Sequence, residues 1–100
     1  MYQSPMIFAE FNQESDYSDF YPELAAFVRA NFENVEAGLQ GDAWIHIQEG
    51  SEQVQLDTFS SMQFQIKSKG SCDLVYAVIK IIAAKYELNV LDSPIFDEDE

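Results

Sequence analysis

The sequence predicts an α+β protein, a two-layer sandwich in which an antiparallel β-meander of about four to five strands has two helices packed on one face. Residues 43–67 alternate apolar and polar side chains in three short runs, which is the period of half-buried strands. Two other segments repeat apolar residues at the spacing of an amphipathic helix. The chain has 100 residues and a hydrophobic content of 47%, which suffices for one domain with a core.

The alternation also predicts the register of the meander. A turn at residues 49–52 joins the first two strands, and residues 58–62 join the second strand to the third. The expected facing pairs are Ile47 with Val54, Ile45 with Leu56, Leu56 with Phe64, and Val54 with Ile66. A slip by one residue would move every apolar side chain to the wet face, so this register is strongly favoured.

The first helix is expected to follow a short edge strand at residues 5–11. Ser18 or Asp19 can cap the helix, because both side chains accept hydrogen bonds from free backbone N–H groups, and Pro22 suits its first turn. The apolar stripe of this helix contains Phe20, Leu24, Phe27, Val28 and Phe32. The helix should end near Asn34.

A fourth meander strand is expected directly after this helix. Val35, Ala37 and Leu39 alternate with other residues, which again is the period of a strand. A connection at residues 41–43 lets Ala37 face Ile47 across a hairpin.

The second helix is expected after Gly70 and Ser71, which break the last meander strand. Its apolar face contains Leu74, Val75, Val78, Ile79, Ile82 and Tyr86. Residues 88–91 add a last short strand, so the element order becomes β-α-β-β-β-β-α-β. One domain then covers residues 1–94, and residues 95–100 form a disordered acidic tail because adjacent carboxylates repel one another.

The net charge of the chain limits the classes of partner that it is expected to bind. The net charge is −13, so direct binding to nucleic acid, which needs clustered Lys and Arg, is not expected. An anionic membrane surface is not expected as a partner for the same reason. The acidic surface either keeps the protein soluble or attracts a basic protein partner.

Cysteine usage and hydropathy indicate the compartment. Cys72 is the single cysteine, so no disulfide forms within the chain, which is typical of a reducing compartment. The first residues lack a basic region, and no apolar stretch approaches the roughly 18 residues that span a bilayer. We therefore expect a cytoplasmic protein without a signal peptide.

Few residues could carry catalysis. His46 is the only histidine, and its expected cross-strand neighbour, Gln55, cannot act as a nucleophile, although Asp57 on the diagonal could orient the ring. Cys72 falls in the first turn of the second helix, where the helix dipole favours a thiolate, but Asp73 opposes that effect. We interpret His46 as a surface or interface residue and Cys72 as an inert thiol, and we expect no enzyme.

Metal and cofactor sites are not expected either. Oxygen-bearing side chains recur at every second position from Asn12 to Ser18, with Glu23 at the twelfth position, as in a calcium-binding loop. Tyr17 occupies the sixth position, where glycine makes the sharp turn, so we interpret this segment as a solvated acidic loop. One cysteine and one histidine cannot form a zinc site, and the sequence has no glycine-rich phosphate loop.

The outer face of the meander is the candidate binding surface. In the predicted register this face has five glutamines, a tryptophan and a histidine, at Trp44, His46, Gln48, Gln53, Gln55, Gln63 and Gln65, beside Asp57 and Lys67. Tryptophan is enriched at interface hot spots, and amides form hydrogen bonds without the desolvation cost of a charge. We therefore expect a small acidic interaction module that binds a protein partner, or itself as a homodimer, through this face.

Two other functions stay open at this point. Carboxylates could stand in for phosphates on a basic DNA- or RNA-binding protein, which would make the chain an acidic nucleic-acid mimic. An ordered array of exposed carboxylates would favour that function. A hydrolase that uses paired carboxylates would instead show a deep pocket with converging acids, although nothing in the spacing of the 18 acids selects a pair.

Overall fold

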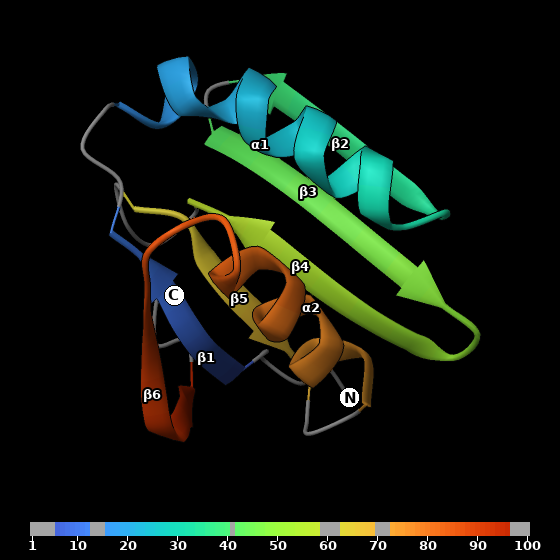
Figure 1. The fold of residues 1–100 in the computed structure, drawn as a ribbon, viewed down its shortest axis with the longest axis vertical. Coiled ribbons are helices and arrows are strands. Elements are labelled where there is room, and N and C mark those ends of the chain that lie inside the picture. The colour runs from blue at the N-terminus through green and yellow to red at the C-terminus, as the bar shows by residue number, and fades with distance from the viewer. Residues whose placement is uncertain (1–5, 13–15, 41, 59–62, 70–72, 97–100) are drawn as a thin grey trace.

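One antiparallel sheet and two helices make up the structure. The computed structural model describes residues 6–12, 16–40, 42–58, 63–69 and 73–96. Its elements are β1 (Met6–Phe11), α1 (Tyr17–Asn31), β2 (Val35–Gln40), β3 (Asp42–Glu49), β4 (Glu52–Asp57), β5 (Gln65–Ser68), α2 (Asp73–Ala83) and β6 (Leu88–Phe96). The strands lie in the order β2-β3-β4-β5-β1-β6, and both helices cover the same face of the sheet (Figure 1). The α+β class and the element order are confirmed, but the sheet has six strands rather than four to five.

β1 is an interior strand, not the edge strand that the sequence suggested. It pairs with β5 on one side and with β6 on the other. Ile7, Phe8, Ala9 and Phe11 are all buried, so β1 is covered on both of its faces. A strand that is buried on both faces has a continuous apolar run instead of an alternation, and this run does not indicate where the strand lies in the sheet.

β6 forms one edge of the sheet and is longer than expected. It runs to Phe96, two residues into the segment that the sequence analysis assigned to the tail, and its last residues pair with the start of β1. Pro94 lacks a backbone N–H, and an edge strand tolerates this because one side of its ladder is free. Residues 97–100, the rest of the expected tail, lie outside the described residues.

The β3–β4 hairpin has the predicted register. Ile47 faces Val54 and Ile45 faces Leu56, and each of these four side chains is at most 1% exposed. Gly50 begins the two-residue loop with a φ of +62°. A type II′ turn requires this conformation at its first loop position, and glycine adopts it without a steric cost.

The other two predicted registers are wrong by two residues. The observed pairs are Leu56 with Ile66 and Ala37 with Ile45, in place of Leu56 with Phe64, Val54 with Ile66 and Ala37 with Ile47. The connection before β5 is longer than expected, and the connection between β2 and β3 is shorter. A shift by two keeps every side chain on its own face, so alternation alone does not select the facing partner.

Each helix packs over its own pair of strands. α1 covers β2 and β3, and α2 covers β4 and β5 (Figure 1). The buried helix residues are Leu24, Ala25 and Val28 in α1 and Leu74, Val75, Val78 and Ile82 in α2. α1 begins after Asp16, earlier than expected, so Pro22 lies inside the helix, which ends at Asn31. In the part of the chain that the structure describes, neither helix has the length and apolar character needed to cross a bilayer.

Five aromatic rings connect both helical segments to β1. They are Phe11, Phe20, Phe27, Phe64 and Tyr86, whose contacting pairs have centroids 5.2 to 6.1 Å apart. The Tyr86 hydroxyl donates a hydrogen bond to Glu23 Oε2 at 3.1 Å, and Lys85 Nζ lies 5.0 Å from the centre of the Phe27 ring. Burial, followed by the hydrogen bond and negative charge of Glu23, raises the pKa of Tyr86 to about 12.

A side chain of the β3–β4 hairpin caps the second helix. The backbone N–H of Leu74, in the first turn of α2, donates to Glu52 Oε1 at 3.0 Å. A carboxylate at this end of a helix satisfies a free N–H and interacts favourably with the helix dipole. Gly70 and Ser71, the expected start of the helix, lie outside the described residues.

We expect Leu56→Ala to lower the free energy of unfolding by about 2–5 kcal/mol, because it opens a cavity between the sheet and α2. Leu56 is 0% exposed, whereas Leu39 on β2 is 41% exposed and provides the matched control. Leu39→Ala should change the free energy of unfolding by no more than about 0.5 kcal/mol. Urea titrations of both variants measure the difference, and similar losses would show that position 56 is not in the core.

The pKa of Tyr86 makes stability fall at alkaline pH. The pKa is 10.0 for an ordinary tyrosine and about 12 here, so the neutral phenol stabilises the fold fully below pH 10. This contribution is lost as the pH rises through about 12. We expect Tyr86→Phe to abolish this part of the fall in stability and to remove the most alkaline step from the ultraviolet phenolate titration. If that step persists in the variant, a different tyrosine has the raised pKa.

Candidate functional site

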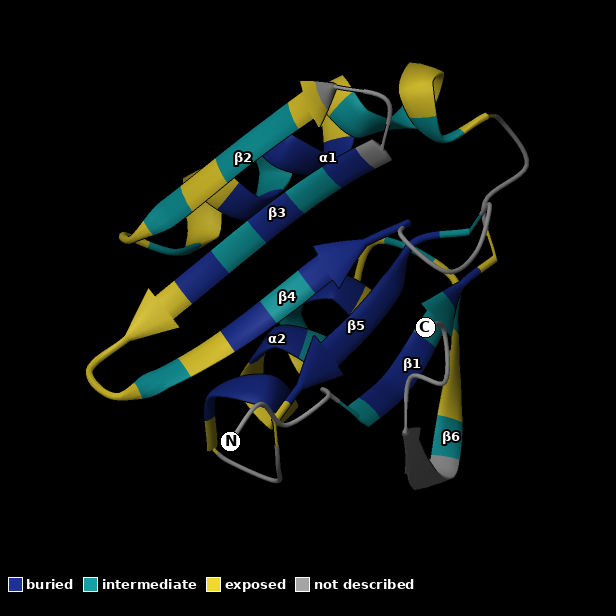
Figure 2. Ribbon diagram, turned by 180° about the vertical axis from the view of Figure 1, so that it is seen from behind, coloured by how far each residue is buried: buried dark blue, intermediate teal, exposed yellow. Residues whose placement is uncertain are grey.

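The face of the sheet away from the helices, here called the outer face, has a buried half and an exposed half. Figure 2 shows this face, on which β5 and β1 are mostly buried while β2 and β3 keep many partly or fully exposed residues. The whole meander face was expected from the sequence to be wet. In the structure β5 is an interior strand between β4 and β1, and all four of its residues are buried.

The buried half contains an ion pair. Lys67 Nζ lies 2.7 Å from Asp57 Oδ1, and the two side chains are 1% and 3% exposed. Gln65 is also buried, and its Nε2 donates to Glu10 Oε2 at 2.9 Å. Ile7 of β1 faces Lys67 and is 6% exposed, so an apolar neighbour replaces the solvent that was expected there. Asp57, Gln65 and Lys67 are therefore not available as surface residues, in contrast to the expectation from sequence.

The exposed half contains an aromatic pair that is held in place by a glycine. Trp44 faces Gly38 on β2, and a Cβ atom at Gly38 would lie 2.6 Å from Trp44 Cζ2. The indole therefore lies across the backbone of β2, in space that any other residue would fill. On the other side Trp44 faces the buried Asp57 on β4, and along β3 its ring lies near His46, whose ring centre is 4.9 Å away with an interplanar angle of 47°.

Glutamine side chains surround this aromatic pair. Gln55 faces His46 across the β3–β4 ladder, and Gln48 faces Gln53. Gln48 and Gln53 are exposed, and Gln55, His46 and Trp44 are half-buried. We call Trp44, His46, Gln48, Gln53 and Gln55 the amide face. These five of the seven residues predicted from the sequence lie together on two adjacent strands.

Gln63 and Gln65 do not belong to the amide face. Gln65 is buried beside Glu10, and Gln63 is half-buried in the segment before β5. The sequence analysis also missed residues that β2 contributes, above all Glu36, which faces His46, and Gly38. Gly38 carried a usable signal, because an isolated glycine in a strand often marks a close approach by another group.

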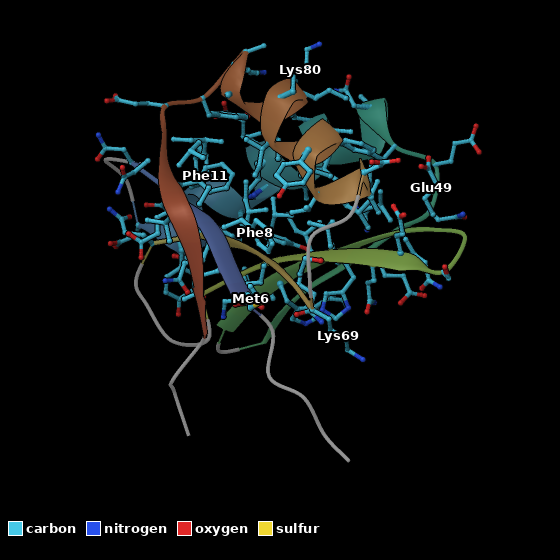
Figure 3. All side chains as sticks on the ribbon, turned by 90° about the horizontal axis from the view of Figure 1, so that it is seen from below. Met6, Phe8, Phe11, Glu49, Lys69 and Lys80 are labelled. Atoms are coloured by element: carbon cyan, nitrogen blue, oxygen red, sulfur yellow. The ribbon has the colours of Figure 1, made fainter. Side chains whose placement is uncertain are left out.

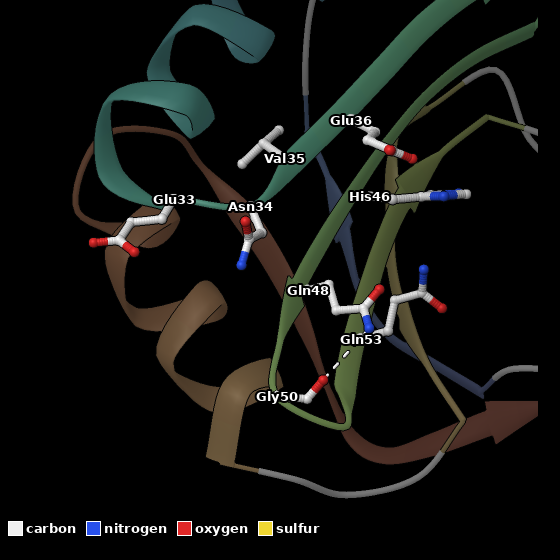
Figure 4. A pocket seen from close by; sticks show the side chains of 8 residues that line it. All are labelled: Glu33, Asn34, Val35, Glu36, His46, Gln48, Gly50 and Gln53. Atoms are coloured by element: carbon white, nitrogen blue, oxygen red, sulfur yellow. Dashed lines mark hydrogen bonds between the residues drawn. The ribbon is translucent and has the colours of Figure 1, made fainter.

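A concavity of about 520 Å³ lies at one end of the amide face, where the β3–β4 hairpin approaches the connection between α1 and β2 (Figure 4). Its polar lining consists mainly of Glu33, Asn34, Glu36, His46, Gln48 and Gln53. Gln48 Nε2 lies 3.4 Å from the carbonyl oxygen of Gly50, and Figure 4 shows the side-chain oxygen of Gln48 on the side away from Gly50.

The described residues cover the calcium-like segment only in part and do not include Cys72. Within the described ranges, no three His, Cys, Asp or Glu side chains are placed to hold a metal ion. Residues 13–15 of the calcium-like segment lie outside those ranges, and residues 17–23 belong to α1 instead of a loop. Charged side chains reach out from the body on more than one side, as Glu49, Lys69 and Lys80 do in Figure 3.

No family model, no curated protein and no solved structure matches this chain. The function must therefore be inferred from the site itself. The amide face offers one aromatic pair, three carboxamides and an adjacent hollow that is lined by two glutamates among other polar residues.

Neither partner of the buried ion pair should be removable on its own. We expect Lys67→Met to cost about 3–5 kcal/mol in unfolding free energy, because it removes the ammonium group that faces the buried Asp57 carboxylate. The double variant Asp57→Leu/Lys67→Met should recover most of this loss, since it leaves no buried charge behind. Lys80→Met, an exposed control on α2, should have an effect within about 0.5 kcal/mol. Equal stability of Lys67→Met and Lys80→Met, measured by denaturant titration, would contradict this interpretation.

Proposed function

We propose that the protein is a non-enzymatic interaction module that binds another protein, or a second copy of itself, through the amide face. The observation that carries the proposal is the placement of Trp44, which is half-buried, lies across Gly38 and packs against His46. Tryptophan is the residue type most characteristic of interface hot spots. An aromatic ring that is already held in place loses little conformational entropy when a partner covers it.

The surroundings of Trp44 support the same proposal. The chain has a net charge of −13, yet Gln48, Gln53 and Gln55 on the amide face are uncharged. The charges nearest to the aromatic pair are Glu36, opposite His46, and the paired Asp57, opposite Trp44. Burying an amide against a complementary group requires hydrogen bonds but not the removal of a charge from water. The amide face can therefore form the dry centre of an interface, with the acidic groups at its rim.

A different protein fits this interface better than a second copy of the chain. Two copies would each have a net charge of −13 and would repel one another at low ionic strength. A basic partner would be attracted by the same charge, and its association rate would fall as salt screens the attraction. Basic nucleic-acid-binding proteins are one class of such partners. An acidic nucleic-acid mimic would bind proteins of this class.

The test compares two variants that alter the indole in different ways. Trp44→Ala removes the ring, and Gly38→Ala displaces it, because the new methyl group would occupy the space of the indole. Each should weaken capture of the partner, or self-association, by about 2 kcal/mol or more, which is roughly thirtyfold in the dissociation constant. Partners are identified by pull-down from cell extract and then measured in purified form, while native mass spectrometry reports self-association.

Tyr76→Ala is the matched control, since Tyr76 is an aromatic residue of α2 that is 53% exposed in the helix layer. This variant should bind as the wild type does. Binding that is unchanged in both Trp44→Ala and Gly38→Ala would refute the proposal. If Trp44→Ala destabilises the fold as much as Leu56→Ala does, the indole is a core residue instead of a contact residue.

A further inference from the structure

The concavity beside the amide face has the size of a side-chain binding site. One water molecule occupies about 30 Å³ of liquid, so a space of about 520 Å³ can receive a whole side chain with its hydration. Three adjacent strands form one side of the hollow: Glu36 on β2 faces His46 on β3, and Gln48 on β3 faces Gln53 on β4. His46 lines the hollow and also contacts Trp44, so a partner covering the amide face would also cover the hollow.

The lining of the concavity favours a cation. Glu33 and Glu36 contribute carboxylates, and Asn34, Gln48 and Gln53 contribute carboxamide oxygens, while no lysine or arginine is among the lining residues. The Gln48 amide nitrogen is directed to the Gly50 carbonyl, which leaves the amide oxygen facing the hollow. An anionic ligand would meet two like charges here, and a neutral apolar ligand would leave these acceptors without donors.

Among cations, the guanidinium group of arginine matches this lining most closely. Glu36 faces His46 directly across the β2–β3 ladder, so a carboxylate and an aromatic ring lie side by side on the outer face. Guanidinium has five N–H donors in a planar fork, pairs with a carboxylate through two hydrogen bonds, and stacks on aromatic rings. The ammonium group of lysine has three donors and a strongly held hydration shell, and it does not stack in this way.

We propose that the concavity receives an arginine side chain of the partner protein, with the guanidinium paired with Glu36 and lying against the His46 ring. The proposal rests on the binding role of the amide face and specifies the partner: a protein that presents an exposed arginine next to the surface that covers Trp44. Glu33 and the three carboxamides supply the remaining acceptors for the guanidinium N–H groups.

The test is an NMR titration of the isotope-labelled full chain at low ionic strength. The probe is N-acetyl-arginine methylamide, and its lysine and citrulline counterparts are titrated in parallel. We expect saturable shifts of the Asn34, Gln48 and Gln53 side-chain amides with the arginine probe, a weaker response to lysine, and no saturable response to citrulline, which is neutral. Glu36→Gln should raise the dissociation constant of the arginine probe about tenfold or more, because it removes a charge-assisted hydrogen-bond pair.

Glu87→Gln is the matched control, because Glu87 is exposed, follows α2, and loses the same charge without touching the concavity. An equal effect of Glu87→Gln and Glu36→Gln would show that diffuse charge attracts the probe, and saturable binding of citrulline would show that charge is not recognised. Either result overturns the arginine site.

If the probe shows no saturable binding while Trp44→Ala still releases the captured protein, the arginine site is wrong and the interface stands. If the probe binds as described but neither Trp44→Ala nor Gly38→Ala affects capture, the interface is wrong and the arginine site stands.

Discussion

The alternation of β3 and β4 is the constraint on which both layers of this protein depend. Ile45, Ile47, Val54 and Leu56 all point to one side of the hairpin, where they form the floor on which α1 and α2 pack. The residues between them necessarily point to the other side. The core and the amide face are thus two faces of the same two strands, and a change of register in one would also move the other.

Much of the fold could be predicted from the sequence because its strongest signals are local. The alternation at residues 43–57 and the two apolar helical stripes required no knowledge of distant residues, and the class, the element order and the β3–β4 register all followed from them. The position of β1 could not be predicted in this way. Its apolar run is compatible with any strand that is covered on both faces, and its place between β5 and β6 depends on pairing across the whole chain.

The outer face was predictable in composition but not in extent. Alternation assigned Trp44 and Lys67 to the same face, and the cross-strand ladders do connect their positions on one side of the sheet. The alternation of apolar and polar residues does not show how many strands the sheet has. The strands on either side of a residue affect how far solvent reaches its side chain. Ile7 and Glu10, more than fifty positions away in sequence, flank Lys67 and Gln65, and this neighbourhood converts predicted surface into a buried polar cluster.

The bond from Leu74 to Glu52 has a consequence for how motion spreads through the molecule. The acceptor belongs to the hairpin and the donor to the first turn of α2, so neither element can open locally without breaking a hydrogen bond of the other. The bond therefore couples opening of the hairpin to opening of the first turn of α2. Gln53, adjacent to Glu52, lies on the amide face. We expect a partner bound to that face to slow amide exchange in the first turn of α2 as well, although α2 lies on the opposite face of the sheet.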